Sequence, residues 1–345
     1  MRIAFFALNL VFAALMPLRA GAFEIESSVF YPAANGLVTL KIISTADANV
    51  FEPILLEFQQ ENPGIDIEYV IASSTELMKA IHTEGAVFDL AISSAMDLQT
   101  KLANDGFART YTSGATAALP QWATWRDQIF AFTQEPAVVI ISAPAFAGIT
   151  PPQTREDLIS LLRDNPEMFD GRIGTYDVRI SGAGYLFATQ DSRNSDSYWR
   201  LTEVMGRLNA RLYGGSGDMI RDVASGELAL AYNVVGSYAN SRLDEFSDLR
   251  IVRFSDYVNV MLRTALIPHN AENPEQAGLM IDFLAGLNAR PELTKLTSLP
   301  PIDPAQLREN SAARPIRLGP GLLVFLDRLK KENFLKNWVS SMEQE

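Results

Sequence analysis

Small hydroxyl and glycine residues recur at points where an apolar, strand-like stretch gives way to a helix-like one. The residues that share this position are Thr45, Ala46, Ser73, Ser74, Ser93, Ser94, Ser181, Gly182 and Gly184. A helix N-terminus offers unpaired N–H groups and the positive end of the helix dipole, so it binds anions without a cationic side chain. Ser and Thr are also ordinary helix caps, so each residue alone has two readings. As a set they favour an anion-binding cleft.

The segment Ser181-Gly182-Ala183-Gly184 is the best single candidate, because two glycines would let a phosphate or carboxylate approach the backbone. Arg179 lies just before it and would either clamp an anionic group with its fork of donors or stay a solvated loop residue. Asn233, Ser237 and Tyr238 follow a buried strand, where contacts from a second domain would lie. These residues complete the ligand-binding set that the residue pattern predicts.

Motifs for covalent or metal chemistry are missing from the sequence. It has no nucleophile elbow, no P-loop and no HExxH helix. The absence of cysteine excludes disulfides, thiolate chemistry, Cys-ligated zinc and iron–sulfur clusters. The two histidines, His82 and His269, are far apart in the sequence. We therefore expect no catalytic residue, no metal site and no cofactor.

The net charge of the chain limits the classes of partner that it is expected to bind. The 345 residues include 29 Lys and Arg against 41 Asp and Glu, a formal net charge of −12. Nucleic-acid surfaces and anionic membranes both require a net basic face, so neither is expected as a partner. A small anion is not excluded, because local donors and dipoles decide the potential inside a buried cleft.

The first 22 residues have the pattern of an export signal. Arg2 precedes an apolar run from Ile3 to Met16, and Ala20-Gly21-Ala22 offers the small residues that signal peptidase recognises. The run is shorter than the roughly 20 residues of a membrane-spanning helix, which favours cleavage. The alternative is a buried amphipathic first helix. Because no cysteine is present for lipid attachment, we expect a soluble periplasmic protein that is not a lipoprotein.

Strand-like and helix-like stretches alternate along the chain, which predicts an α/β fold with a mainly parallel sheet. The first unit alternates from Val38 to Ala103, and a second begins at Ala137 and reaches Tyr232. The length also exceeds that of a usual single core, so we expect two lobes, each a mixed sheet flanked by helices.

The predicted boundaries assign residues 37–134 and 265–345 to lobe 1 and residues 138–258 to lobe 2. The chain would cross between the lobes near 133–138 and again near 257–265. Two crossings make a hinge, and a hinge puts a ligand cleft between the lobes. Arg263 lies in the second crossing and is a weaker candidate for ligand contact.

Several segments in this order resemble the type II periplasmic solute-binding proteins of ABC transporters, in the branch that holds ferric-iron, sugar-phosphate and phosphoglycerate-type binding proteins. The segments that carry the resemblance are residues 39–58, Asn62-Pro63-Gly64-Ile65, 88–97, 175–177, 181–185, 226–239, 273–277 and 283–284. Each motif is weak alone, whereas the ordered set covers nearly the whole chain after the signal. It is more specific for the fold than for the ligand.

The resemblance implies a two-lobed type II fold joined by a two-crossing hinge, and it adds Tyr185 to the binding residues. It implies an ABC importer's substrate-binding component that captures a small anionic solute, phosphorylated or carboxylated, and partners an inner-membrane permease. Ferric-binding relatives use adjacent tyrosines, where this chain has Asn233 and the single Tyr238. Alternatives left open are iron binding, signalling through a membrane sensor kinase and, least favoured, an enzyme on this fold.

Overall fold

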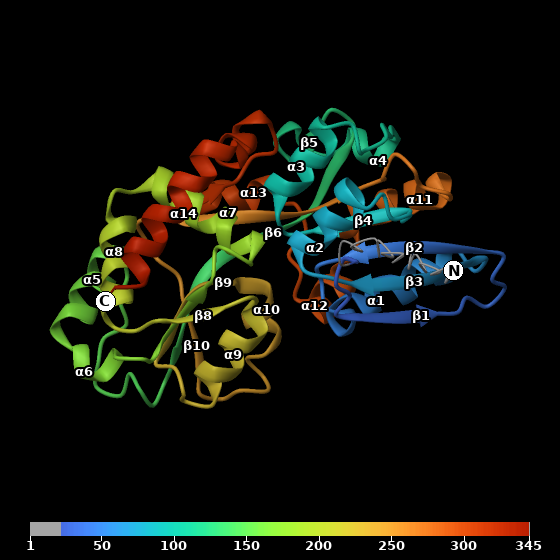
Figure 1. Ribbon diagram of the computed structural model, residues 1–345. Helices are drawn as coiled ribbons and strands as arrows, with labels where there is room; N and C mark the ends of the chain where they lie inside the picture. Colours follow the sequence, from blue (N-terminus) through green and yellow to red (C-terminus); the bar gives the residue numbers. More distant parts are fainter. Residues whose placement is uncertain (1–21, 345) are drawn as a thin grey trace, which may run out of the picture.

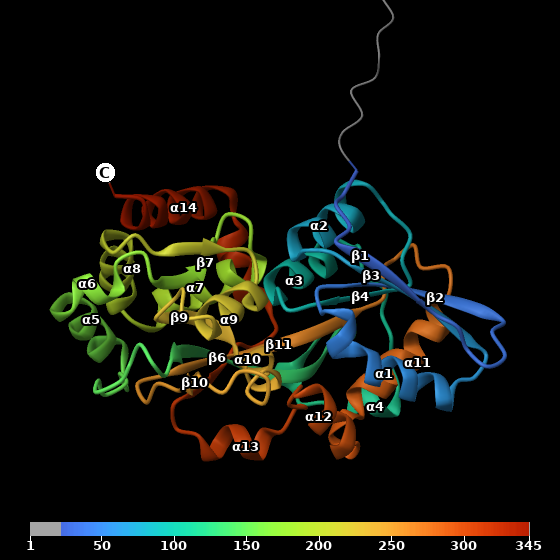
Figure 2. The ribbon, with the colours of Figure 1, turned by 90° about the horizontal axis from the view of Figure 1, so that it is seen from below.

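The computed structural model describes residues 22–344. The predicted signal peptide, apart from Ala22, lies outside the described residues. Figure 1 shows two α/β lobes side by side, and Figure 2 shows the same arrangement from below. No helix in the described part of the chain is both long and apolar enough to span a membrane.

The first lobe is built around strands in the order β1-β3-β2-β4-β11. β2 pairs in parallel with both β3 and β4, whereas β1 is antiparallel to β3 and β11 is antiparallel to β4 and parallel to β12. Its elements are β1 (Ser27–Tyr31), β2 (Val38–Ser44), α1 (Ala48–Glu61), β3 (Ile65–Ile71), α2 (Ser74–Met78) with a π-helical turn (Lys79–Thr83), β4 (Leu90–Ser93), α3 (Met96–Asn104), α4 (Gly114–Ala117), β5 (Thr124–Trp125), α11 (Pro274–Ala285), α12 (Pro291–Thr297), α13 (Pro304–Glu309), β12 (Ala313–Pro315) and a 3-10 segment (Pro320–Leu326).

The second lobe continues the same sheet in the order β6-β9-β7-β8. β7 is parallel to β8 and β9, and β6 is antiparallel to β9 and β10. Its elements are α5 (Arg155–Asp164), α6 (Pro166–Phe169), β7 (Ile173–Tyr176), α7 (Gly182–Asn194), α8 (Ser197–Arg207), β8 (Arg211–Tyr213), α9 (Ser216–Ala224), β9 (Leu230–Val235), α10 (Gly236–Ser241) and β10 (Leu249–Val252).

Two strands join the lobes. The long strand β6 (Ile129–Ser142) pairs with β11 through residues 130–136 and with β9 and β10 through residues 137–142. The chain returns between β10 and β11 (Val258–Leu266). A paired two-strand ribbon therefore connects the lobes, as in a hinge. One apolar cluster continues across both lobes, from Ile43 and Leu77 of the first to Phe187 and Met219 of the second.

The helix α14 (Arg328–Met342) departs from the expected assignment of residues 265–345 to lobe 1. Its Phe334, Trp338 and Met342 are buried in the apolar core of the second lobe, with Tyr198 and Leu201 of α8. Figure 1 shows α14 lying beside α8. The i, i+4, i+8 spacing of these three residues identifies the apolar face of the helix, but that spacing carries no information about which lobe it covers.

Candidate functional site

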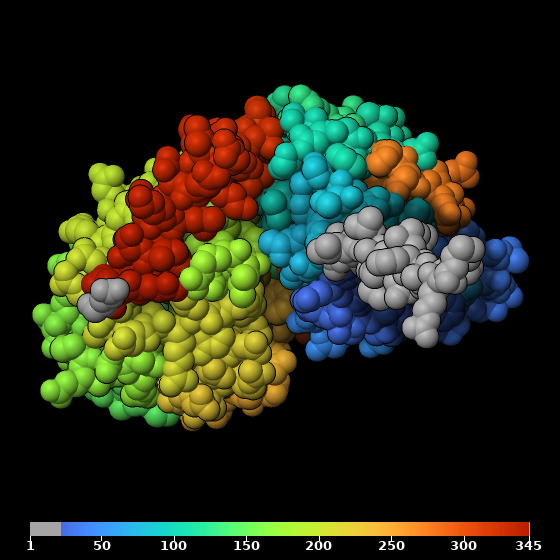
Figure 3. Space-filling model, viewed as in Figure 1, coloured from blue at the N-terminus to red at the C-terminus, as the bar shows by residue number. Residues whose placement is uncertain are grey.

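A cleft of about 770 Å³ lies between the lobes, and its walls come from both of them. In Figure 3 the surface is hollowed between the yellow residues of the second lobe and the blue residues of the first. The first-lobe wall consists of Glu24, Glu26, Thr45, Asp47, Ala72, Ser73, Ser74, Thr75, Glu76 and Ser94. The second-lobe wall consists of Tyr176, Arg179, Ile180, Ser181, Ala183, residues 214–218, Val235 and Tyr238, and the hinge contributes Arg263.

The two walls already touch at the cleft. The backbone N–H of Asp47 donates to the hydroxyl of Tyr238 at 3.2 Å. Thr75 donates its hydroxyl to the carbonyl of Ile180 at 3.5 Å. The lobes are therefore close enough for one small molecule to bind both walls at once.

Hydroxyl residues at the strand–helix junctions meet here, as the sequence pattern predicts. Ser73 is the N-cap of α2 and accepts from the N–H of Glu76 at 3.2 Å, while Ser181 caps α7 and accepts from Gly184 at 3.2 Å. Thr45 accepts from the N–H of Ser94 at 3.2 Å. Hence these oxygens already accept from the backbone, and their hydroxyl hydrogens are what they can offer a ligand.

Seven of the predicted binding residues line the cleft, and whether they bind a ligand stays a prediction. They are Thr45, Ser73, Ser74, Ser94, Arg179, Ser181 and Tyr238. The other seven lie outside it, at Ala46, Ser93, Gly182, Gly184, Tyr185, Asn233 and Ser237. All residues at the end of a strand or the start of a helix lie near the cleft, but only some of their side chains face it.

The two glycines of the 181–184 segment both lie where a side chain would clash with a packed neighbour. A Cβ on Gly184 would lie 2.3 Å from the Cβ of Tyr176, and one on Gly182 would lie 2.4 Å from the hydroxyl of Ser74 across the cleft. Gly182 thus lets the two lobes approach each other, and Gly184 lets α7 sit on β7. Neither glycine lines the cleft, and whether a ligand contacts them stays a prediction.

The remaining five residues outside the cleft have structural partners. Ala46 is fully buried and its carbonyl accepts from Tyr69, and the Ser93 hydroxyl accepts from the N–H of Ala95. Tyr185 donates to the carbonyl of Phe325 at 2.5 Å. Asn233 donates to the buried Asp191 at 2.7 Å, and Ser237 donates to Glu135. The bonds of Tyr185, Asn233 and Ser237 link segments far apart in the chain, so a local pattern does not reveal them.

Arg179 lines the cleft, but each of its three guanidinium nitrogens already donates to a carboxylate. Its Nε and Nη2 each donate to Asp177 at 2.8 Å, and its Nη1 donates to Glu343 at 2.6 Å. The hydrogen bonds to Asp177 raise the pKa of the guanidinium above its usual value, so the charge is retained. A ligand therefore meets a neutralised arginine here, not the free clamp that the sequence suggests.

Arg263 is the cation at the hinge side of the cleft, and its side chain is 1% exposed. Nε and Nη2 donate to Glu135 at 2.9 and 3.1 Å, and within the described residues Nη1 has no hydrogen-bond partner. Burial opposes its charge, yet the attraction of Glu135 leaves the pKa of Arg263 raised. The side chain is therefore a charged, buried group with one donor unused.

Carboxylates gather on the first-lobe wall, which the sequence reasoning did not foresee. Glu24 and Glu26 come from the segment before β1, Asp47 precedes α1, and Glu76 lies in α2. Burial, together with the charge of Asp47, raises the pKa of Glu26. Burial is also the main cause that raises the pKa of Asp47. The acidic residues just before β1 and α1 are the sequence feature that could have indicated this acidic wall.

The second-lobe wall also contains a glycine-rich segment that is not among the predicted binding residues. Residues 214–217 read Gly-Gly-Ser-Gly and lead into α9, whose N-cap Gly215 provides no side-chain cap. Tyr176 lies beside it and shares a 2.5 Å hydrogen bond with Ser216. Small residues before a helix are a recognisable anion-site signature, and here they face the cleft.

Comparisons with known proteins agree with this architecture. A family model described as bacterial extracellular solute-binding protein matches residues 40–295. A substrate binding protein of an ABC transporter from Agrobacterium tumefaciens is 31% identical over 92% of this chain and 98% of its own, with a TM-score of 0.87. A comparison with curated proteins found no match.

Two more distant solved structures share the fold. The periplasmic binding protein AfuA from Actinobacillus pleuropneumoniae, with fructose-6-phosphate bound, is 16% identical over 89% of this chain and 99% of its own, with a TM-score of 0.72. Iron-bound HitA from Pseudomonas aeruginosa is 18% identical over 88% and 99%, with a TM-score of 0.66. The two-lobed fold, the hinged cleft and the family model lead to one conclusion: this chain belongs to the bacterial extracellular solute-binding proteins, the non-enzymatic substrate-binding components of ABC transporters.

Proposed function

We propose that this protein captures a small organic anion that also carries hydroxyl or ammonium groups, holds it between its lobes, and delivers it to the membrane permease of an ABC importer. The anionic group is phosphate or carboxylate. We further propose that the chain is exported by cleavage of residues 1–22 and works in the periplasm, free of a lipid anchor.

The observation that carries the proposal is the unused donor of Arg263. A buried donor without a partner costs about 1–3 kcal/mol, and more when the group is charged. Glu135 balances the charge of the guanidinium but satisfies only part of its hydrogen bonds, because it occupies Nε and Nη2 and leaves Nη1 without a partner among the described residues. An anionic oxygen of a ligand would complete the set, and it would do so in a site of low dielectric, where such a bond is strong.

The N-termini of two helices support the same end of the ligand. α7 begins after Ser181 and α9 begins after Gly215, and both residues line the cleft. Because Gly215 has no side chain, the first N–H groups of α9 are not capped from that position. N–H groups at the positive end of a helix dipole suit a phosphate or carboxylate.

The acidic wall limits what the rest of the ligand can be. Glu24, Glu26, Asp47 and Glu76 face the same cleft from the first lobe. A molecule that is anionic throughout would be repelled there, whereas hydroxyl or ammonium groups would donate to these carboxylates. The two walls together therefore favour a ligand with an anionic head and a donor-rich body.

Ferric iron is the less favoured ligand. Among the described residues no group of three or more His, Asp or Glu side chains is arranged to hold a metal ion. Burial is the main cause that raises the pKa of Tyr238 to about 12, so its hydroxyl stays protonated in the absence of a metal. A sensory role through a membrane kinase remains an alternative to transport, and the same cleft would serve it.

A ligand panel tests the proposal. The protein without residues 1–22 is titrated by calorimetry and thermal shift with fructose 6-phosphate, 3-phosphoglycerate, gluconate, neutral fructose and ferric citrate. We expect one-to-one binding of at least one hydroxylated anion and no binding of fructose. Ligand at about 100 times its Kd would stabilise the protein by about 2.7 kcal/mol. Binding of fructose equal to that of its phosphate, or a stoichiometric tyrosinate–iron band, would contradict the proposal.

A further inference from the structure

A second cavity, of about 430 Å³, lies behind the hinge. It shares no lining residue with the cleft. Figure 2 shows α12 and α13 on the other side of β6 and β11 from α2 and α3, and these two helices help to form the cavity. A volume in this range suits a small molecule of a few hundred daltons at most.

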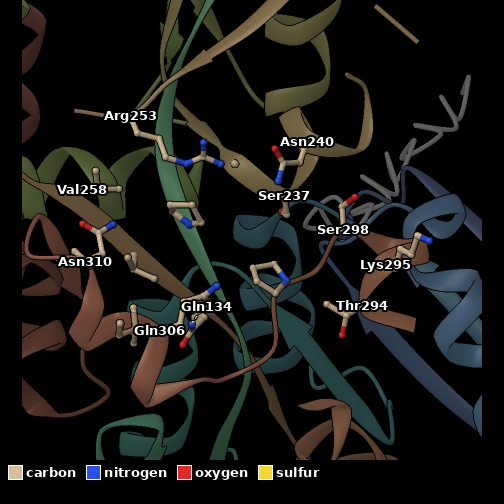
Figure 4. A pocket seen from close by; sticks show the side chains of 16 residues that line it. Gln134, Ser237, Asn240, Arg253, Val258, Thr294, Lys295, Ser298, Gln306 and Asn310 are labelled. Carbon is tan, nitrogen blue, oxygen red and sulfur yellow. Dashed lines mark hydrogen bonds between the residues drawn. The ribbon is translucent and has the colours of Figure 1, made fainter. Parts of the chain in front are cut away.

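The walls of this rear cavity come from both lobes and from the ribbon between them. Asn240 of α10 and Arg253 after β10 belong to the second lobe, and Thr294 of α12 belongs to the first. Pro136 and Val260 of the two hinge strands form part of an apolar floor. Figure 4 shows Arg253 extending its guanidinium toward Asn240, with Thr294 and Gln306 on the opposite side. An occupant would therefore contact both lobes at once.

The charges around the rear cavity are of one sign. Arg253 and Lys295 line it, and no Asp or Glu does. Neither cation makes an ion pair within the part of the chain that the structure describes, whereas arginines such as Arg200 and Arg207 pair with glutamates. In a chain with 41 acids against 29 bases, a cavity with two cations and no acid has an unusual potential.

We propose that the rear cavity is a second ligand site, which binds a small organic anion with an apolar body, such as an aromatic carboxylate. Arg253 binds the carboxylate with two parallel N–H donors, a geometry that suits guanidinium. The hydrocarbon part of the ligand lies on Pro136, Val258 and Val260. The proposal does not depend on what the cleft binds.

A short relay of side chains connects this cavity to the cleft. Ser237 lines the rear cavity and donates to Glu135, and Glu135 accepts from Arg263, which lines the cleft. Because the occupant also touches both lobes, its affinity differs between lobe arrangements. A ligand with such a difference in affinity shifts the equilibrium between those arrangements.

The probe for the test is 8-anilinonaphthalene-1-sulfonate, an apolar aromatic anion whose fluorescence rises on binding. We expect the protein without residues 1–22 to bind it and benzoate to displace it, while neutral benzamide of the same shape does not. Arg253→Gln should weaken probe binding at least fivefold, and Arg253→Lys should restore part of it. Arg109→Gln, at an exposed first-lobe arginine outside both cavities, should leave binding within 1.5-fold.

The outcomes separate this site from other surfaces. A probe bound in the cleft or on an exposed apolar patch would be unaffected by Arg253→Gln, and that result overturns the proposal. Displacement by benzamide as effective as by benzoate also overturns it, because the anionic group would then not matter. Absence of any probe binding has the same consequence.

Discussion

Two buried arginines show how differently the second-lobe core and the hinge treat a charge. The side chain of Arg155 is 2% exposed and that of Arg263 is 1% exposed. All three guanidinium nitrogens of Arg155 have partners: Nε donates to Tyr232, Nη1 to Asp256 and Nη2 to Asp191. Arg263 has only Glu135, and its Nη1 is left over within the described residues.

The difference teaches that burial alone does not identify a binding group. Asp191, at the centre of the second-lobe network, is fully buried and accepts from Arg155, Tyr232, Asn233, Tyr257 and Asn259. A network whose donors and acceptors are all used holds a fold together and has nothing left for a ligand. The hinge has one buried donor without a partner among the described residues, and it belongs to Arg263, a residue that lines the cleft.

Breaking the saturated network should have the largest effect. Arg155→Met leaves Asp191 buried with four donors but no compensating cation. Removal of one partner of a buried ion pair costs about 3–5 kcal/mol. We expect urea denaturation to show a loss of that size, and calorimetry to show that any protein still folded binds the cleft ligand normally. A loss below 1 kcal/mol would mean that Asp191 does not need the charge of Arg155.

The hinge arginine should instead affect affinity. Arg263→Met removes the donor we assign to the ligand, and a charge-assisted hydrogen bond contributes about 1.5–3 kcal/mol, so calorimetry should show affinity falling by about 10- to 100-fold. The substitution also leaves the fully buried Glu135 without its cationic partner. The double variant Arg263→Met with Glu135→Gln removes that charge as well.

The double variant separates the two roles of Arg263. We expect it to recover stability relative to Arg263→Met while binding stays weak. Asn233→Gly serves as a control from the saturated network, because residue 233 has a φ of 64° that glycine accepts. It should cost about 1 kcal/mol of stability and leave the affinity unchanged. An Arg263→Met protein that binds normally would rule out a ligand role for the unused donor.

The contrast between the two arginines also shows which features could be predicted from the sequence and which could not. Local patterns indicated the strands and the helix starts, as at Val38–Ile43, because β-branched runs and hydroxyl caps act over a few residues. They indicated that Ser181 begins a helix, and the structure agrees. They could not distinguish Tyr238, which faces the cleft, from Asn233, which faces Asp191, because that depends on contacts across about 40 residues or more of chain.

The other features that the sequence did not predict depend on contacts between residues far apart in the chain. Arg263 and Glu135 are separated by 128 residues, so no local pattern shows that one donor is left over. The position of Glu24 and Glu26 at the cleft depends on the pairing of β1 with β3, which joins segments about 40 residues apart. The lobe that α14 covers could not be predicted either, since both lobes offer apolar surface.

A third buried charge, Asp97 of α3, sharpens the rule. Its side chain is nearly fully buried, it accepts from the N–H of Leu98 at 2.9 Å, and it forms no ion pair within the described chain. It does not line the cleft. Asp97 has few hydrogen-bond partners to stabilise its charge, and it does not line the cleft where a ligand could bind it. We therefore expect its ionised form to destabilise the folded protein.

Burial raises the pKa of Asp97 to about 6, against an ordinary value of 3.8. The folded state therefore holds a proton between about pH 4 and pH 6 that the unfolded state has lost. Stability falls as pH rises through this window, and the charged carboxylate destabilises the fold above it. At about 1.4 kcal/mol per pH unit, the effect at pH 7.5 is on the order of 2–3 kcal/mol.

Asp97→Asn should therefore raise the free energy of unfolding by about 1–3 kcal/mol at pH 7.5, because the amide keeps an acceptor for Leu98 without the buried charge. At pH 4.5 the native carboxyl is mostly protonated, so the gain should shrink below about 1 kcal/mol. Urea denaturation at the two pH values measures both, with Asp244→Asn as the exposed control that changes neither. An equal gain at both pH values would show that packing, not charge, governs this site. A lower free energy of unfolding for Asp97→Asn at pH 7.5 would show that the carboxylate has partners beyond Leu98. It would then be untrue that a buried charge with too few partners either binds a ligand or destabilises the fold.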